Sequence, residues 1–176
     1  SLSSEQTQSA ANNSTHIGDL DFMVATPVEG VTPGGAGDET SGVNFIYNHV
    51  FTLLEFQITG TGTLSKVKLA GPGTLAFSNG TIDITQGTPD KGVVYTIDGM
   101  GDESGEVTVE LVTPVELGVD PVSVYMMINP GVHTGDLAIG LEIGGEYMYM
   151  SKQSPLNVNL YFGFDRGKKY EVPLDA

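Results

Sequence analysis

Apolar and polar residues alternate along most of this chain, with the period of two that places successive side chains on opposite faces of a β-strand. The alternation is strongest in four segments, residues 107–111, 122–128, 137–143 and 156–164. Shorter segments with the same period lie between turn-forming residues, at 64–69, 75–77, 82–84, 93–97 and 170–174. We expect each of these segments to form a strand.

Helical spacing of apolar residues does not extend over the roughly ten residues that a helix needs. The closely spaced strands are separated by turns that contain many of the 24 glycines and 9 prolines of the chain. This pattern predicts an all-β fold, either an antiparallel β-sandwich or a barrel, and disfavours βαβ units.

The apolar positions change parity within residues 42–62. They fall first on odd and then on even numbers: Val43, Phe45 and Tyr47, then Leu54, Phe56 and Ile58. One strand cannot bury both sets on one face unless an extra residue intervenes. We expect a bulge or bend near His49 and Val50, where the strand passes from one sheet to the other or turns its side chains over. A ring held by backbone hydrogen bonds at this bulge explains His49 more simply than a catalytic or metal-binding role.

The N-terminal part of the chain differs in composition from the rest. Residues 1–15 are rich in Ser, Gln and Asn, so we expect residues 1–18 to be a polar, poorly ordered arm. Residues 19–42 contain the short apolar stretch "DFMVAT", which predicts one short strand, followed by a linker rich in Gly and Pro. Residues 43–176 are then expected to form the β-sandwich domain.

Charge and composition exclude several function classes. The 22 acidic and 7 basic residues give a net charge of -15, which repels nucleic acid and anionic lipid. The absence of cysteine excludes disulfides and thiolate chemistry. No apolar run approaches the length of a membrane span, and the N-terminus lacks the regions of a signal peptide, so we expect a mature chain whose targeting segment has been removed.

Motifs for catalysis and cofactor binding are not found in the sequence. There is no G-x-S-x-G motif, and the serines lie in ordinary turn sequence, so we predict no catalytic residues and no cofactor. The acidic segment "DGMGDESGE" offers weak calcium candidates, which are Asp98, Asp102, Glu103 and Glu106. Their spacing differs from the EF-hand template, so we favour a solvated hairpin tip and predict no metal site.

Two tyrosines in "GGEYMYMS" form a candidate binding face. Tyr147 and Tyr149 share one parity, so a strand here points both rings to the same side. On an outward face, such a pair could stack on sugar rings or anchor a protein partner, because each ring combines a large apolar surface with a polar tip. Packing in the core is the commoner alternative.

The last apolar segment is a candidate edge for assembly with another chain. Tyr170, Val172 and Leu174 share a parity and are expected to face the core. Pro173 lacks a backbone donor and is tolerated best on an edge strand. An edge strand offers backbone groups to a strand of another chain.

Several stretches resemble one known family. They are "DFMVAT", "VNFIYNHVFTLLEFQI", "LSKVKLAGPGTLAFSNGTIDIT", "SVYMMINPG" and "FDRGKKYEVPL". Over residues 19–174 the chain is similar to the fimbrillin family of anaerobic gut and oral bacteria, and especially to its Mfa-like members.

The resemblance implies an antiparallel, Greek-key, transthyretin-like β-sandwich. It also implies a fimbrial subunit at the outer membrane that takes part in adhesion, assembles with other fimbrial subunits by strand addition, and meets a surface protein or glycan. Family stalk subunits are cleaved after an arginine, but the single arginine here, Arg166, lies in the last hairpin. A tip or accessory subunit, or a C-terminal domain, is therefore favoured over a stalk subunit. The alternative from another class is a carbohydrate-binding module of a secreted glycan-utilisation system, although the lack of tryptophan argues mildly against it.

Overall fold

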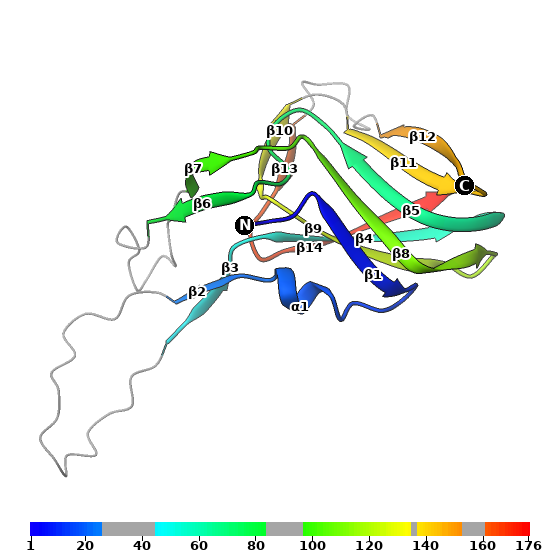
Figure 1. The fold of residues 1–176 in the computed structure, drawn as a ribbon, viewed down its shortest axis with the longest axis horizontal. Coiled ribbons are helices and arrows are strands. Elements are labelled where there is room, and N and C mark those ends of the chain that lie inside the picture. Colours follow the sequence, from blue (N-terminus) through cyan, green and yellow to red (C-terminus); the bar gives the residue numbers. More distant parts are fainter. Residues whose placement is uncertain (26–44, 84–96, 135–136, 153–160) are drawn as a thin grey trace, which may run out of the picture.

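Two open β-sheets form the body of the protein (Figure 1). The computed structural model describes residues 1–25, 45–83, 97–134, 137–152 and 161–176. The strands of the five-stranded sheet, in spatial order, are β1 (Glu5–Ala10), β8 (Glu106–Leu117), β5 (Gly62–Ala70), β11 (Leu137–Ile143) and β12 (Glu146–Lys152). Those of the three-stranded sheet are β14 (Lys169–Asp175), β4 (Thr52–Thr59) and β9 (Val122–Ile128).

Shorter elements extend from this body. Three two-stranded ribbons pair β2 (Met23–Ala25) with β3 (Tyr47–His49), β6 (Asn79–Ile82) with β7 (Ile97–Gly101), and β10 (Gly131–Thr134) with β13 (Tyr161–Phe164). Within the described ranges the one helix is α1 (Ile17–Leu20), a single turn that is too short to cross a membrane. The all-β prediction is confirmed. The first part of the expected strand at 156–164, and most of the expected linker, lie outside the described residues.

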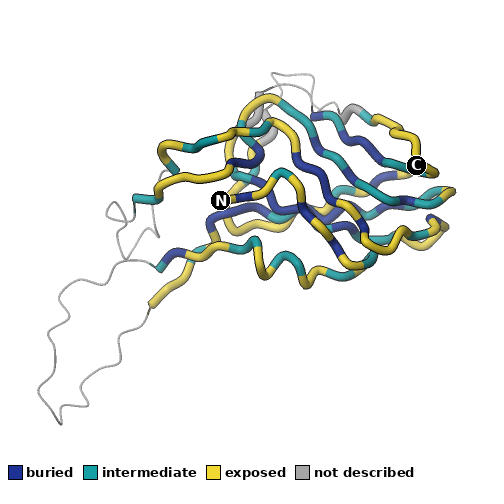
Figure 2. Tube along the Cα trace, viewed as in Figure 1, coloured by how far each residue is buried: buried dark blue, intermediate teal, exposed yellow. Residues whose placement is uncertain are grey.

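The two sheets enclose one apolar core, because each presents its alternating apolar residues to the other. β4 contributes Leu54, Phe56 and Ile58, none of which is more than 1% exposed. Val67 of β5 and Val109 of β8 belong to the same cluster and are fully buried. The buried stretches accordingly follow the middle of both sheets (Figure 2).

Strand direction departs from the purely antiparallel prediction at two edges. β1 runs parallel to β8, and β14 runs parallel to β4, whereas the other strand pairs of the described residues are antiparallel. A hairpin forces its two strands to be antiparallel, but these two edge strands join their neighbours from distant parts of the chain. Their direction is therefore not determined by a short turn.

The N-terminal segment forms part of a sheet, so the expectation of a poorly ordered arm is wrong for residues 5–10. Gln6 and Gln8 point inward from β1 and are almost completely buried. The Gln6 amide accepts a hydrogen bond from Met127 N at 3.0 Å and donates one to Met127 O at 2.7 Å. The Gln8 amide accepts from Tyr125 N at 2.8 Å and donates to Ser123 O at 3.1 Å. Polar side chains of one sheet therefore bind the outer backbone edge of β9 in the other.

Asn12 and His16 bind two further backbone groups of this β9 edge, and we call the whole set of these hydrogen bonds the seal on β9. Asn12 adopts a positive φ of 62°, which asparagine tolerates better than most residues, and its Oδ1 accepts from Ser123 N at 2.6 Å. His16 Nε2 lies 3.1 Å from Tyr125 O and is therefore the protonated nitrogen that donates to this carbonyl. The second ring nitrogen, Nδ1, is buried without a hydrogen-bond partner. Burial consequently lowers the pKa of His16, although the Tyr125 carbonyl opposes the shift.

The change of parity near His49 corresponds to a passage between two pairings. β3 pairs with β2, whereas β4 lies in the centre of the three-stranded sheet. Val50 and Phe51 separate the two strands and are buried, at 0% and 4% exposure. The chain does change pairing at this corner, but two separate strands replace the one bulged strand, and the passage is from the β2–β3 ribbon to the three-stranded sheet and not between the two sheets of the body.

Replacing Gln8 tests the seal on β9. We expect Gln8→Ala to lower the free energy of unfolding by about 1–3 kcal/mol, because the buried Tyr125 N–H loses its acceptor. Thr7→Ala on the exposed face of the same strand is the matched control and should change it by less than about 0.5 kcal/mol. Urea denaturation of both variants measures the difference, and equal effects would contradict a stabilising role for the glutamine amide.

Acidification should destabilise the protein through His16. The folded state holds the pKa of His16 below the ordinary value of 6.5, so the unfolded state binds the proton more readily. Stability contributed by neutral His16 is therefore present above about pH 6.5 and is lost as the pH falls further. In His16→Gln, which keeps a neutral donor, the melting temperature should fall less between pH 7 and pH 5. Identical pH profiles for the two proteins would exclude this role of His16.

Candidate functional site

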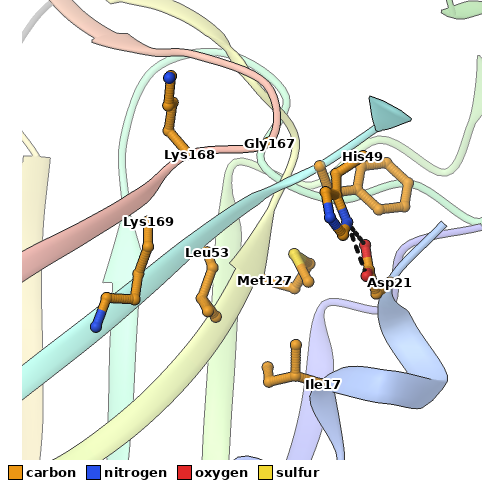
Figure 3. A pocket seen from close by; sticks show the side chains of 9 residues that line it. Ile17, Asp21, His49, Leu53, Met127, Gly167, Lys168 and Lys169 are labelled. Carbon is orange, nitrogen blue, oxygen red and sulfur yellow. Dashed lines mark hydrogen bonds and ion pairs between the residues drawn. The ribbon is translucent and has the colours of Figure 1, made fainter. Parts of the chain in front are cut away.

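A cavity of about 150 Å³ lies where the β2–β3 ribbon joins the body (Figure 3). Its walls come from α1, the corner between β3 and β4, β9 and the turn before β14. The lining residues are Ile17, Asp21, His49, Phe51, Leu53, Met127, Gly167, Lys168 and Lys169. Apolar side chains thus form one wall, and charged groups lie at its rim.

His49 and Asp21 form a hydrogen-bonded pair at this cavity. His49 Nδ1 lies 2.9 Å from Oδ1 and 2.8 Å from Oδ2 of Asp21. The His49 ring thus has a carboxylate partner, which the expectation of backbone hydrogen bonds did not include. A histidine and a carboxylate can orient a nucleophile, but no serine, threonine or cysteine is among the residues that line this cavity. The pair instead links Asp21, two residues before β2, to His49 at the end of β3.

The lysines at the rim differ in their pairing. Lys169 Nζ lies 2.6 Å from Glu55 Oε2 and 3.2 Å from Glu171 Oε1. The Lys169 hydrogen bond, supported by one from Ser123, lowers the pKa of Glu55. Lys169 therefore joins β14 to β4, while the Lys168 side chain points away from His49 in Figure 3.

The ribbon beside the cavity has an apolar surface. We name this surface the ribbon patch and define it by Phe22, Met23, Phe45, Ile46 and Tyr47, which are between 49% and 61% exposed. The Phe45 and Tyr47 ring centroids are 6.4 Å apart. The apolar alternation of residues 43–47 predicts a buried face for these two rings, and that prediction is wrong. The ribbon projects beyond both sheets, so no second sheet covers it (Figure 1).

Tyr147 and Tyr149 stack on the outer face of the five-stranded sheet. Their ring centroids are 5.8 Å apart, and their planes differ by 21°. Tyr149 is 61% exposed and Tyr147 is 38% exposed, so neither packs in the core. A Cβ added to Gly140 would lie 2.9 Å from Tyr149 Cε1 and 3.4 Å from Tyr147 Cδ1, so both rings lie against this glycine. An isolated glycine within a strand is the sequence signal that could have indicated this close approach.

Three of the four calcium candidates bind different partners. Ser78 Oγ donates to Asp102 at 2.8 Å, Thr74 donates to Glu103, and Lys68 pairs with Glu106 at 2.7 Å. In the described part of the chain, no three His, Asp or Glu side chains gather into a set that could hold a metal ion. The absence of a calcium site at Asp98 and its neighbours stays a prediction.

The closing strand β14 lies at an edge of the three-stranded sheet. Leu174 is 5% exposed, and Tyr170 and Val172 pack against the core, whereas the residues between them are exposed. Leu53 N donates to Lys168 O, and Ala176 N donates to Thr59 O, so even-numbered residues supply the bonds to β4. The nitrogen of Pro173 accordingly faces away from β4, and its missing donor costs the ladder nothing.

Comparison with known proteins gives the family. A family model described as fimbrillin-like matches residues 2–175 of this chain. The chain belongs to the fimbrillin-like family. The resemblance inferred from the sequence motifs is thereby confirmed, and no curated protein matches this fimbrillin-like chain.

A solved structure shares the fold. It is a protein of Bacteroides uniformis ATCC 8492 described as a candidate cell adhesion protein, and it superposes with a TM-score of 0.59 at 17% sequence identity. The alignment covers 95% of the fimbrillin-like chain and 59% of the Bacteroides protein. At this identity the likeness establishes the fold alone, and our chain corresponds to only part of that longer protein.

Truncating a core side chain of β14 tests how firmly this edge is held. Leu174→Ala should lower the free energy of unfolding by about 2–5 kcal/mol, because it leaves a cavity in the shared core. Glu171→Ala, on the exposed face of the same strand, should have a much smaller effect, since its ion pair with Lys169 is open to solvent. Thermal unfolding of both variants provides the measurement. A small effect of Leu174→Ala would show that β14 is not an integral part of the sheet.

Proposed function

We propose that this chain is a non-enzymatic, surface-exposed fimbrial subunit that takes part in adhesion, in a tip or accessory position. The observation that carries the proposal is the fimbrillin-like match over nearly the whole chain. Its partners are other fimbrial subunits, and its location is the fimbrium at the outer membrane. The two sheets with their shared core are consistent with the transthyretin-like, Greek-key sandwich expected of such a subunit.

The described site chemistry supports a binding protein more than an enzyme. His49 and Asp21 are paired with each other, and no serine, threonine or cysteine is among the described residues that line the cavity beside them. The cavity of about 150 Å³ is also smaller than the roughly 300 Å³ at which ligand pockets usually begin. The His49–Asp21 pair instead joins the two strands of the ribbon at their base.

Two surfaces suit contacts with neighbouring subunits. The ribbon patch places five large apolar side chains in water, and such patches usually mark interaction sites. The β14 edge offers the outward backbone groups of Glu171 for strand addition. The ribbon and β12 lie toward opposite ends of the long axis, so a subunit bound at the ribbon leaves the other end accessible (Figure 1).

The proposal is tested in the bacterium that produces the chain. Antibody labelling of intact cells should detect it at the surface, and it should co-sediment with sheared fimbriae. Ile46→Asp should reduce co-sedimentation at least fivefold while leaving the amount in the cell unchanged, because a charge in the ribbon patch opposes burial against a partner. Absence of the chain from the surface, or from sheared fimbriae, would contradict the proposal.

Two further variants test the ribbon patch and the β14 edge separately. Val119→Asp alters another exposed apolar residue, 93% exposed and away from the ribbon, and should leave incorporation unchanged. Glu171→Pro removes an outward donor of β14 without breaking its bonds to β4, and should weaken incorporation if strands are added at this edge. Normal incorporation of Glu171→Pro would exclude strand addition at β14 but would leave the ribbon contact standing.

A further inference from the structure

The outer face of the five-stranded sheet carries a built aromatic surface, which we name the tyrosine platform and define by Tyr147, Tyr149 and the underlying Gly140. In the strand register, Gly140 lies between Tyr149 of β12 and Lys68 of β5. The absence of a side chain at Gly140 lets the two rings lie across the backbone of β11. Their inner faces are covered in this way, and their outer faces remain open to solvent.

Two lysine–glutamate pairs border the platform. Lys68 Nζ lies 5.4 Å from the Tyr147 ring centroid and 2.7 Å from Glu106 Oε1. Lys66 Nζ lies 3.6 Å from Glu142 Oε2, and Ser65 Oγ donates to the other Glu142 oxygen at 2.8 Å. The Ser65 hydrogen bond lowers the pKa of Glu142, and burial raises the pKa of Tyr147. Each of the two lysines that border the platform is thus paired with a carboxylate.

We propose that the tyrosine platform binds an uncharged pyranose ring of a glycan. The C–H face of such a sugar carries partial positive charge and stacks on the negative face of an aromatic ring, as cations do. The hydroxyls at the rim of the sugar can bond to the Tyr147 hydroxyl and to the Glu142 carboxylate. This inference rests on the proposed function, because it names the ligand class for its adhesive part.

Charge and size favour a neutral sugar over the other occupants. The two lysines are already paired with carboxylates, and the chain has a net charge of -15, so an acidic glycan gains no unpaired cation and is repelled at long range. A stable protein interface buries about 800 Å² on each partner, far more than two tyrosine rings offer. Two rings with centroids 5.8 Å apart form a small surface, which suits a small ligand better than a protein.

The test uses purified protein and saturation-transfer NMR with cellotriose, maltotriose, xylotriose and lactose, and with sialyllactose as the acidic counterpart. At least one neutral sugar should receive saturation at its ring C–H protons. Tyr147→Ala and Tyr149→Ala should each weaken its binding at least tenfold. Tyr149→Phe, which keeps the ring, should bind within about threefold of the parent, since most of the stacking surface remains.

Two further variants distinguish the loss of a sugar contact from a general loss of structure. Tyr47→Ala removes another tyrosine, exposed to the same 61% but in the ribbon patch, and should leave sugar binding unchanged. Gly140→Ala keeps both tyrosines but places a methyl group 2.9 Å from the Tyr149 ring, so it should displace the rings and weaken binding. The melting temperature of each variant shows whether it is folded.

Four results would overturn the proposal. They are binding of no sugar in the panel, tighter binding of sialyllactose than of lactose, unchanged binding by a folded Tyr149→Ala, and loss of fimbrial incorporation in Tyr149→Ala. The last result would assign the platform to a protein partner. Failure of sugar binding with normal, ribbon-dependent incorporation would leave the fimbrial proposal intact, so the two proposals can fail separately.

Discussion

The outer edge of β9 governs how the two sheets hold together. Its backbone groups at Ser123, Tyr125 and Met127 face away from β4, and an open sheet must satisfy such groups with water or with other parts of the protein. Residues 6–16 bind all six of them. Since Gln6 and Gln8 also belong to β1, the same segment is hydrogen-bonded in one sheet and fastened to the other, and it closes the core along this side.

The ribbon depends on the same fastening. Met127, which Gln6 binds through both of its backbone groups, also lines the cavity beneath His49 and belongs to a second apolar cluster with Val50 and Phe51. That cluster supports the corner where the chain leaves the ribbon for β4. The His49–Asp21 pair then fixes the two strands of the ribbon at their base. The exposed apolar surface of the ribbon is thus supported at its base by buried apolar residues and by this side-chain pair.

Strands whose inward residues are apolar could be predicted from the sequence, and β4 with Leu54, Phe56 and Ile58 is the clearest case. β1 could not, because its inward residues Gln6 and Gln8 are polar and bind backbone groups in place of apolar neighbours. The opposite error concerns Phe45, whose ring was expected to be buried. Apolar periodicity does not reveal whether a second sheet covers a strand, so it could not show that this ring is exposed. For the candidate sites, parity placed the two tyrosines on one face, but their exposure depends on distant strands. Asp21 was missed as the partner of His49 because the two lie 28 positions apart.

The fastening of β9 also has a kinetic consequence. Gln6 and Met127 are separated by 121 positions, and Lys169 is separated from its partner Glu55 by 114. Contacts between such distant residues form slowly, because a long loop must close before they can stabilise the fold. During synthesis, the segment that binds the β9 edge emerges long before β9 itself, and β4 likewise emerges long before β14. The chain therefore passes through a period in which apolar strand edges are exposed, and its yield in the cell will depend on protection from aggregation during that period.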